Sequence, residues 1–314
     1  MQTINDKKGI NIKELVPTLV VGITLLCLVI VVKNQYSSVL LKNANYGMPA
    51  LIEKGNIDNL YLGSSMFRQG LSIDVLNDNN SAESHYILSY NGNQPVAEYV
   101  ELKYLLDNNV KIKNLYVDMY LDSVTAEPDI SDEKLFLETD IRTKVELFNT
   151  LPNKTFNDFW NMFVTSNNDQ LLTWPVTYAL VNKQFLDGGT RIQNEGLSEK
   201  DYIKLKVPIV PDKLNSNQIE YLNKLIILCR TNDVNLVFIE TPKAKCVLED
   251  EAYKSLMKEY GRYLVEYGVS CIRYGEDYTF DLKDSKLFLD AVHLSSQGRD
   301  VFTRLFCDIA GNMV

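Results

Sequence analysis

Short apolar runs alternate along this chain with longer stretches in which apolar residues recur every three or four positions. The short runs are typical of strands buried in a sheet, and the longer stretches are typical of helices that pack on one face. The predicted strands are residues 57–62, 114–121, 234–239 and 269–273, and the predicted helices are residues 98–106, 217–230 and 253–267. Because these helices lie between strands, they form the crossovers that parallel strands require. The pattern predicts an α/β fold with a mostly parallel sheet.

The alternation stops between Leu121 and about residue 214. This stretch contains five of the nine prolines and both tryptophans, Trp160 and Trp174. A loop of this length without its own structure is uncommon in a compact domain. We therefore predict a mainly helical insertion over residues 122–214 that folds over the carboxyl edge of the sheet. Its role stays open between a lid or acceptor-binding surface and a structural subdomain packed on the side.

The beginning of the chain has a different pattern. Residues 15–32 contain no formal charge, and Lys13 and Lys33 flank them. A helix that spans a bilayer needs about 17–25 residues, so this run predicts an uncleaved membrane anchor. A buried core helix is disfavoured by the terminal position, and a signal peptide by the length of the run and the missing cleavage site. The predicted segments are a tail over 1–14, a transmembrane anchor over 15–33, a linker over 34–56 and an α/β domain over 57–314.

Charge and cysteine content narrow the functional classes. The formal net charge is −9, and no run of lysine or arginine alternates with aromatic residues, which argues against a nucleic-acid partner. The small excess of lysine in the tail favours a tail in the cytoplasm and a large domain outside the cell membrane. Beyond Cys27, the four cysteines show no Cys-x-x-Cys spacing and no histidine cluster accompanies them. We predict neither a metal nor a cofactor.

The candidate chemistry lies in two segments far apart in the sequence. Near the start, the strand-like run Leu60–Leu62 ends at Gly63-Ser64-Ser65, a small-residue turn that presents hydroxyl groups. Near the end, Asp290 and His293 supply an acid and an imidazole three positions apart, before a predicted helix. A serine becomes a nucleophile when a base takes its proton and a third group orients that base. The chain has one other histidine, His85, in a stretch expected to be helix or loop, for which packing is the favoured role.

These segments resemble the blocks of the SGNH (GDSL-like) hydrolase superfamily. Gly63-Ser64-Ser65 is similar to the first block and implies that Ser65 is the nucleophile. Asp290, His293, Leu294, Ser295 and Gly298 match the last block, Asp-x-x-His-Leu-Ser-x-x-Gly, which implies that His293 is the general base and Asp290 its orienting partner. The resemblance covers residues 57–121 and 234–310 and implies a three-layer α/β/α fold.

The resemblance also implies an oxyanion hole. Tyr90-Asn91-Gly92-Asn93 is similar to the second block, so the backbone N–H of Gly92 joins that of Ser65 as a candidate donor. The third block, Gly-x-Asn-Asp, is absent from the strand that ends near Asp118, and Asn93 is the candidate substitute for its side-chain donor.

Three more side chains are candidate substrate contacts. Ser64 lies beside the nucleophile, Arg68 follows it closely, and Lys243 leaves the predicted strand at 234–239 on the same edge of the sheet. For Arg68 a structural ion pair is the alternative, and for Lys243 a solvated loop position.

A Ser-His-Asp set with an oxyanion hole performs acyl transfer to water or to another hydroxyl. The anchor, the Gly-Ser-Ser turn and the insertion together resemble the membrane-anchored branch of the superfamily, which includes the D-alanine transfer protein DltD and polysaccharide O-acetyltransferases and esterases. That resemblance implies an O-acyltransferase or esterase outside the membrane, a cell-envelope glycan or teichoic-type polymer as substrate, and a multi-spanning membrane O-acyltransferase as partner. The alternative is a catalytically silent scaffold that binds envelope glycan or that partner.

Overall fold

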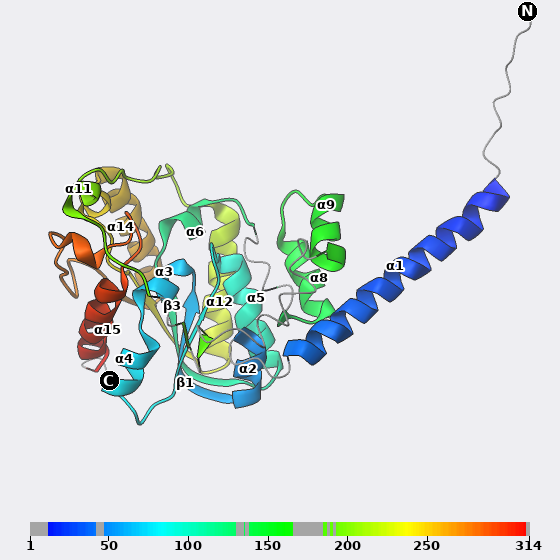
Figure 1. Ribbon diagram of the computed structural model, residues 1–314, viewed down its shortest axis with the longest axis horizontal. Helices are drawn as coiled ribbons and strands as arrows, with labels where there is room; N and C mark the ends of the chain where they lie inside the picture. Colours follow the sequence, from blue (N-terminus) through cyan, green and yellow to red (C-terminus); the bar gives the residue numbers. More distant parts are fainter. Residues whose placement is uncertain are drawn as a thin grey trace, which may run out of the picture.

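A five-stranded parallel sheet forms the centre of the molecule (Figure 1). The computed structural model describes residues 12–41, 47–129, 135, 138–165, 185–186, 189–190 and 193–311. The strands are β1 (Asn56–Gly63), β2 (His85–Ser89), β3 (Lys111–Asp118), β6 (Asn235–Ile239) and β7 (Ser270–Ile272). They pair in the order β2-β1-β3-β6-β7, and every pair is parallel. The predicted α/β fold with a parallel sheet is confirmed.

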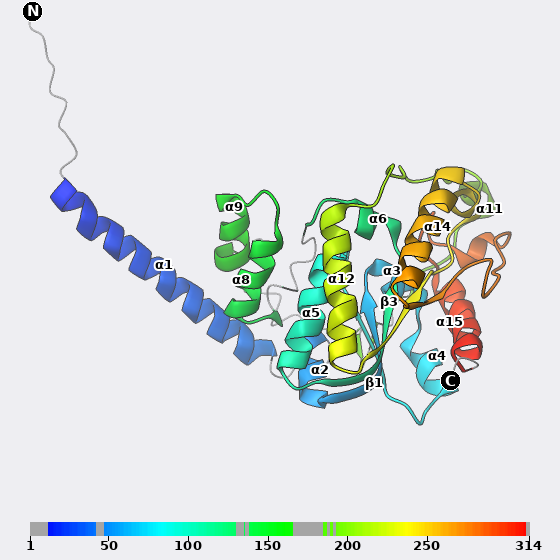
Figure 2. The ribbon, with the colours of Figure 1, turned by 180° about the vertical axis from the view of Figure 1, so that it is seen from behind.

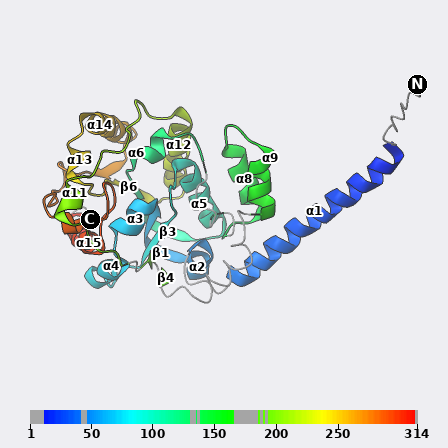
Figure 3. The ribbon, with the colours of Figure 1, turned by 45° about the horizontal axis from the view of Figure 1, so that its top comes forward.

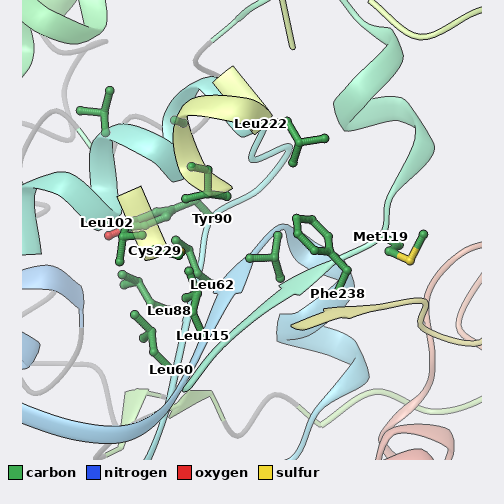
Figure 4. Close-up of a cluster of buried hydrophobic side chains, with 14 of the residues drawn as sticks. Leu60, Leu62, Leu88, Tyr90, Leu102, Leu115, Met119, Leu222, Cys229 and Phe238 are labelled. Carbon is green, nitrogen blue, oxygen red and sulfur yellow. The ribbon is translucent and has the colours of Figure 1, made fainter. Parts of the chain in front are cut away.

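Alternate side chains of β1 enter two separate cores, because successive residues of a strand face opposite sides of a sheet. Leu60 and Leu62 belong to the first core, which Figure 4 shows with side chains from the neighbouring strands, and Tyr61 belongs to the second. The first core is covered by α5 (Pro95–Asp107), α12 (Ser216–Thr231) and α14 (Glu251–Glu266). The second is covered by α3 (Ser65–Gly70), α4 (Ile73–Asn79) and α15 (Ser296–Gly311). Helices thus lie on both faces of the sheet (Figure 2).

The chain changes faces of the sheet beside β1. Helices α3 and α4 connect β1 to β2 on one face, and α5 returns from β2 to β3 on the other. In sheets of this kind the crevice at the carboxyl ends of the strands, where the order reverses, is the usual place for a ligand. The turn after β1 and the end of β3 meet at that point.

One local prediction is wrong. His85 begins strand β2 instead of lying on a helix or loop, because the buried Tyr86, Ile87 and Leu88 pair with β1. Within the predicted linker 34–56, residues 47–54 form helix α2 (Gly47–Lys54), since its Met48 and Leu51 are fully buried in the first core.

The predicted insertion divides into two parts. Its first part packs beside α5, as Figure 3 shows for α8 and α9, and corresponds to the side subdomain. Its second part crosses the carboxyl edge, where Ile209 and Val210 line a cavity together with Tyr120. The described elements are the helices α6 (Leu121–Thr125), α8 (Ile141–Thr150), α9 (Phe156–Phe159), the π-helix η1 (Trp160–Thr165) and α11 (Glu199–Tyr202), with the two-residue strands β4 (Phe185–Leu186) and β5 (Gly189–Thr190). Trp174 lies outside the described residues.

A long helix, α1 (Ile12–Leu41), extends away from the α/β body (Figure 1). Ten large apolar side chains between Val16 and Val32 are 51–60% exposed, and Ile30 packs near η1 at the edge of the body. Over the residues that the structure describes, no helix is both long and apolar enough to cross a membrane. The predicted anchor over residues 15–33 falls on α1.

Candidate active site

Folding brings together the three side chains that the sequence places in two distant segments. Ser65 Oγ lies 2.9 Å from His293 Nε2, although the two residues are 228 positions apart. His293 Nδ1 lies 2.8 Å from Asp290 Oδ2. Both contacts have hydrogen-bond length, and they use the two different nitrogens of one ring. The imidazole is therefore held between the hydroxyl and the carboxylate, as nucleophilic catalysis by serine requires.

The turn after β1 presents Ser65 at the start of a helix. Ser64 is the N-cap of α3, and its Oγ accepts a hydrogen bond of 3.1 Å from the N–H of Met66. Serine is a favoured N-cap because its hydroxyl satisfies an N–H that the helix leaves unpaired. Gly63 permits a close approach behind the turn, since a Cβ there would lie 2.5 Å from Asp118 Oδ1. Gly63 and Ser64 therefore shape the turn, while Ser65 remains partly exposed.

The loop that carries Asp290 and His293 is held by hydrogen bonds between its own residues. Asp290 Oδ1 accepts hydrogen bonds of 2.8 Å from the N–H groups of Val292 and His293, while its Oδ2 receives the ring. The loop is fixed at its end by Ser295, whose Oγ donates to Lys286 O at 2.6 Å and accepts from the N–H of Gly298 at 3.1 Å. This last contact lies at the start of α15, so Ser295 links that helix to the loop.

The electrostatics of the site favour an ionised Asp290. Partial burial raises the pKa of this carboxyl, but the hydrogen bonds from His293 and from the Val292 N–H outweigh that effect and lower the pKa below its usual value. A carboxylate at this place fixes which ring nitrogen carries the proton, leaving Nε2 free to accept the hydroxyl proton of Ser65.

Two backbone N–H groups are candidate oxyanion donors. Neither the N–H of Ser65 nor that of Gly92 donates a hydrogen bond to another described residue. Gly92 has φ of +61°, a left-handed conformation that glycine adopts without strain. Its loop follows β2, whose carboxyl end lies beside that of β1, with the Tyr90 N–H donating to Gly63 O at 3.0 Å.

Asn93 has a hydrogen-bond partner on α5. Its side chain is 5% exposed, and Nδ2 donates to Glu101 Oε2 on α5 at 2.9 Å. The amide thus ties the loop after β2 to α5. This contact uses one of the two N–H groups of the amide, and Asn93 as the side-chain donor of the oxyanion hole stays a prediction.

The structure also corrects two of the candidate substrate contacts. Ser64 is fully buried, with both its N–H and its hydroxyl directed to Asp118. Lys243 is 1% exposed and donates to Thr241 O at 3.0 Å, so it does not lie in solvent at the edge of the sheet. Burial lowers the pKa of Lys243, opposed by Glu240, Asp118 and Asp122.

Arg68 links α3 to the loop after β2. Its Nη2 donates to Asn91 Oδ1, one residue before Gly92. The guanidinium therefore connects the helix that begins with the candidate nucleophile to the candidate oxyanion loop. The remaining histidine, His85, lies at the other end of β2, with Nδ1 3.1 Å from the Tyr61 hydroxyl. Burial lowers the pKa of His85, in keeping with a packing role.

Asp118 is a site residue that the sequence reasoning missed. It ends β3 at the carboxyl edge, and its side chain is 2% exposed. Burial raises the pKa of this carboxyl to about 6, opposed by the hydrogen bonds from Ser64 and by the charge of Lys243. The sequence did contain one signal for this role. Asp118 is an acid at the end of a predicted strand, in the place where the absent third block, Gly-x-Asn-Asp, was expected.

Comparison with known proteins adds only general information. No family profile and no curated protein matches the chain. An acylhydrolase-assigned structure from Bacteroides fragilis is 11% identical, with a TM-score of 0.38, over 82% of this chain and 88% of that one. A GDSL-like lipase from Bacteroides thetaiotaomicron is 9% identical, with a TM-score of 0.39, over 83% and 91%. A structure from Desulfitobacterium hafniense, assigned as a lipolytic protein of the G-D-S-L family, is 9% identical, with a TM-score of 0.40, over 81% and 99%. At these values we draw no conclusion from the similarity, and we assign no residue role from it.

Proposed function

We propose that this protein is a serine-dependent acyl-transfer enzyme, an esterase or an O-acyltransferase. The observation that carries the proposal is the pair of contacts on one ring, Ser65 Oγ to His293 Nε2 at 2.9 Å and His293 Nδ1 to Asp290 Oδ2 at 2.8 Å. Ser65 and His293 are the residues that act on the substrate, and Asp290 holds the ring.

In the first half of the proposed reaction, Ser65 Oγ attacks the carbonyl carbon of an ester and its proton passes to His293 Nε2. The carbonyl oxygen becomes an oxyanion, which the N–H groups of Ser65 and Gly92 stabilise, at about 3–4 kcal/mol for each such donor. The tetrahedral intermediate then collapses. The leaving alcohol takes the proton from His293, and the acyl group remains on Ser65.

In the second half, an acceptor hydroxyl gives its proton to His293 and attacks the carbonyl carbon of the acyl-enzyme. The bond from that carbon to Ser65 Oγ then breaks, His293 returns the proton to Ser65 Oγ, and the acyl group leaves on the acceptor. Water as acceptor gives an esterase, and a hydroxyl of a glycan or polymer gives a transferase. The two outcomes differ in how well the site excludes water. We further propose that the acceptor is a cell-envelope glycan or teichoic-type polymer and that the partner is a multi-spanning membrane O-acyltransferase. The sequence resemblance alone supports both.

We expect a fluorophosphonate probe to label the full chain, because such probes react with a serine whose proton is taken by a neighbouring base. Labelling should disappear in Ser65→Ala and persist in Ser296→Ala, a serine next to the same loop. An aryl acetate should be hydrolysed with the same requirement. Folded wild-type protein that is neither labelled nor active would instead support the silent scaffold.

We also propose that α1 anchors the protein in the cell membrane with the α/β domain outside. The apolar, uncharged residues 15–32 and the outward exposure of their large side chains support this part of the proposal. A helix that is apolar on all sides loses exposed apolar area when lipid surrounds it.

The full chain is therefore expected in the membrane fraction after an alkaline wash. Leu25→Lys combined with Val29→Lys should release it, since each lysine at the centre of a span costs about 3 kcal/mol. The matched control is Ile203→Lys, at an apolar residue of the body that is 76% exposed, which should leave the protein in the pellet. Wild-type protein in the wash would contradict the anchor, and protection of the domain from protease added to intact cells would contradict its orientation.

A further inference from the structure

Three charged side chains are buried beneath the turn that carries Ser65. Asp118 ends β3, while Glu240 and Lys243 follow β6, and all three are 1–3% exposed. Strands β3 and β6 are neighbours, with Asp118 opposite Ile239 in the register. Buried charges cost free energy unless they are paired, so their presence beside the candidate site needs a reason.

Asp118 makes its contacts with the turn itself. Its Oδ2 accepts two hydrogen bonds from Ser64, one from the N–H at 3.1 Å and one from the hydroxyl. Ser64 Oγ in turn accepts from the N–H of Met66. Ser65 lies between these two residues, so the backbone on both sides of the nucleophile is tied to one carboxylate. Gly63 allows this, because a side chain there would collide with Asp118 Oδ1.

Resting on the proposed function, we propose that Asp118 is a positioning residue that aims Ser65 at His293. A carboxylate is an acceptor only, so it receives both donors of Ser64. When protonated it carries a donor hydrogen of its own and competes with the Ser64 hydroxyl. The turn then loses the contact that fixes it.

The surroundings of Asp118 contain several titratable groups. The groups that interact with it are Lys243 after β6, Glu98 on α5, Tyr120 after β3 and Tyr260 on α14. Burial raises the pKa of Glu98 well above its usual value, with smaller contributions from Asp118 and Glu101. Burial likewise raises the pKa of both tyrosines, which leaves Lys243 as the charge that opposes protonation of Asp118.

A pH profile separates this role from a structural one. Two groups must be unprotonated for Ser65 to react, the imidazole of His293 and the carboxyl of Asp118, whose pKa is about 6. If two groups must lose a proton, a plot of the logarithm of the rate against pH has a limiting slope of two on its acid side. If only one group must lose a proton, that slope is one. A residue that only stabilised the fold would change the amount of folded protein and leave this slope alone.

The experiment measures the rate of fluorophosphonate labelling of Ser65 in the full chain between about pH 4 and pH 8. We expect a slope of two for wild type and of one for Asp118→Asn, whose amide cannot gain a proton. Asp118→Ala should lower the plateau rate about 100-fold, the scale of a small misplacement of a reacting group. The matched control is Glu98→Gln, at a buried acid on α5 whose pKa burial also raises, which should keep the slope of two.

The outcomes distinguish this inference from the proposed function. Equal slopes for wild type and Asp118→Asn, with Ser65 still labelled, would overturn the positioning role and leave the acyl-transfer proposal intact. Absence of labelling in wild type, or labelling that persists in Ser65→Ala, would overturn the proposed function and this inference with it. Circular dichroism and the thermal midpoint of each variant establish that folded proteins are compared.

Discussion

His293→Ala is expected to lower kcat/KM for an aryl acetate by about 10⁵-fold, the scale on which removal of the base from such a triad acts. The ring is the only group in hydrogen-bond contact with both Ser65 and Asp290 among the described residues. Without it, the hydroxyl proton has no acceptor. Asp290→Asn should cost less, about 10³-fold, because the Asp290 side chain is 48% exposed and water can take over part of its role.

Two variants serve as controls for this series. His85→Ala removes the other imidazole and should leave kcat/KM within about threefold, since its ring contacts Tyr61 and not the triad. Asp78→Asn removes an exposed carboxylate from α4 and should do the same. An active His293→Ala variant, or a loss in His85→Ala as large as in His293→Ala, would contradict the assignment of the base.

Gly298→Ala is expected to reduce the free energy of unfolding by about 3 kcal/mol or more, because the added methyl group has no space. A Cβ at this position would lie 1.9 Å from the carbonyl oxygen of Leu287 and 2.8 Å from its carbon. These are backbone atoms, so no rotamer change relieves the collision. The N–H of Gly298 also donates to Ser295 Oγ, which holds the end of the loop with Asp290 and His293. Activity should fall together with stability. Urea unfolding and kcat/KM of the folded fraction measure the two effects.

The control for this substitution lies at the other end of the same helix. Gly311 is the last residue of α15, and a Cβ there would meet no atom within 4 Å. Gly311→Ala should therefore be neutral or stabilise the protein by about 0.5 kcal/mol, through the reduced freedom of the unfolded chain. Equal stability of the two alanine variants would show that the start of α15 is free to move away from Leu287.

The central elements of the fold were predictable because hydrophobic periodicity is a local property. The run 57–62 became β1, and the helix predicted over 217–230 became α12, each with bounds moved by one residue at either end. Strand β2 was missed since its ends, His85 and Ser89, are polar and only three apolar residues stand between them. Helix α2 was missed because it has only eight residues, and a segment this short shows little hydrophobic periodicity of its own.

The candidate site was predictable in part for the same reason. Gly63-Ser64-Ser65 and Asp290-x-x-His293 are local motifs, each contained within a few neighbouring residues. The surroundings of Asn93 and Lys243 were not predictable, since Asn93 donates to Glu101 on α5 and Lys243 is buried at the end of β6, where it donates to Thr241 O.

By itself, the sequence determined the α/β alternation, the turn that presents Ser65 and the acid–imidazole pair near the end, because these depend on neighbours along the chain. Only the tertiary structure decided that Ser65 and His293 meet and that Asp118 lies behind Ser64. Both depend on the order of the strands and on which side chains are buried between them. Burial of a polar group is set by packing between distant segments, and that packing has no signature within any one of them.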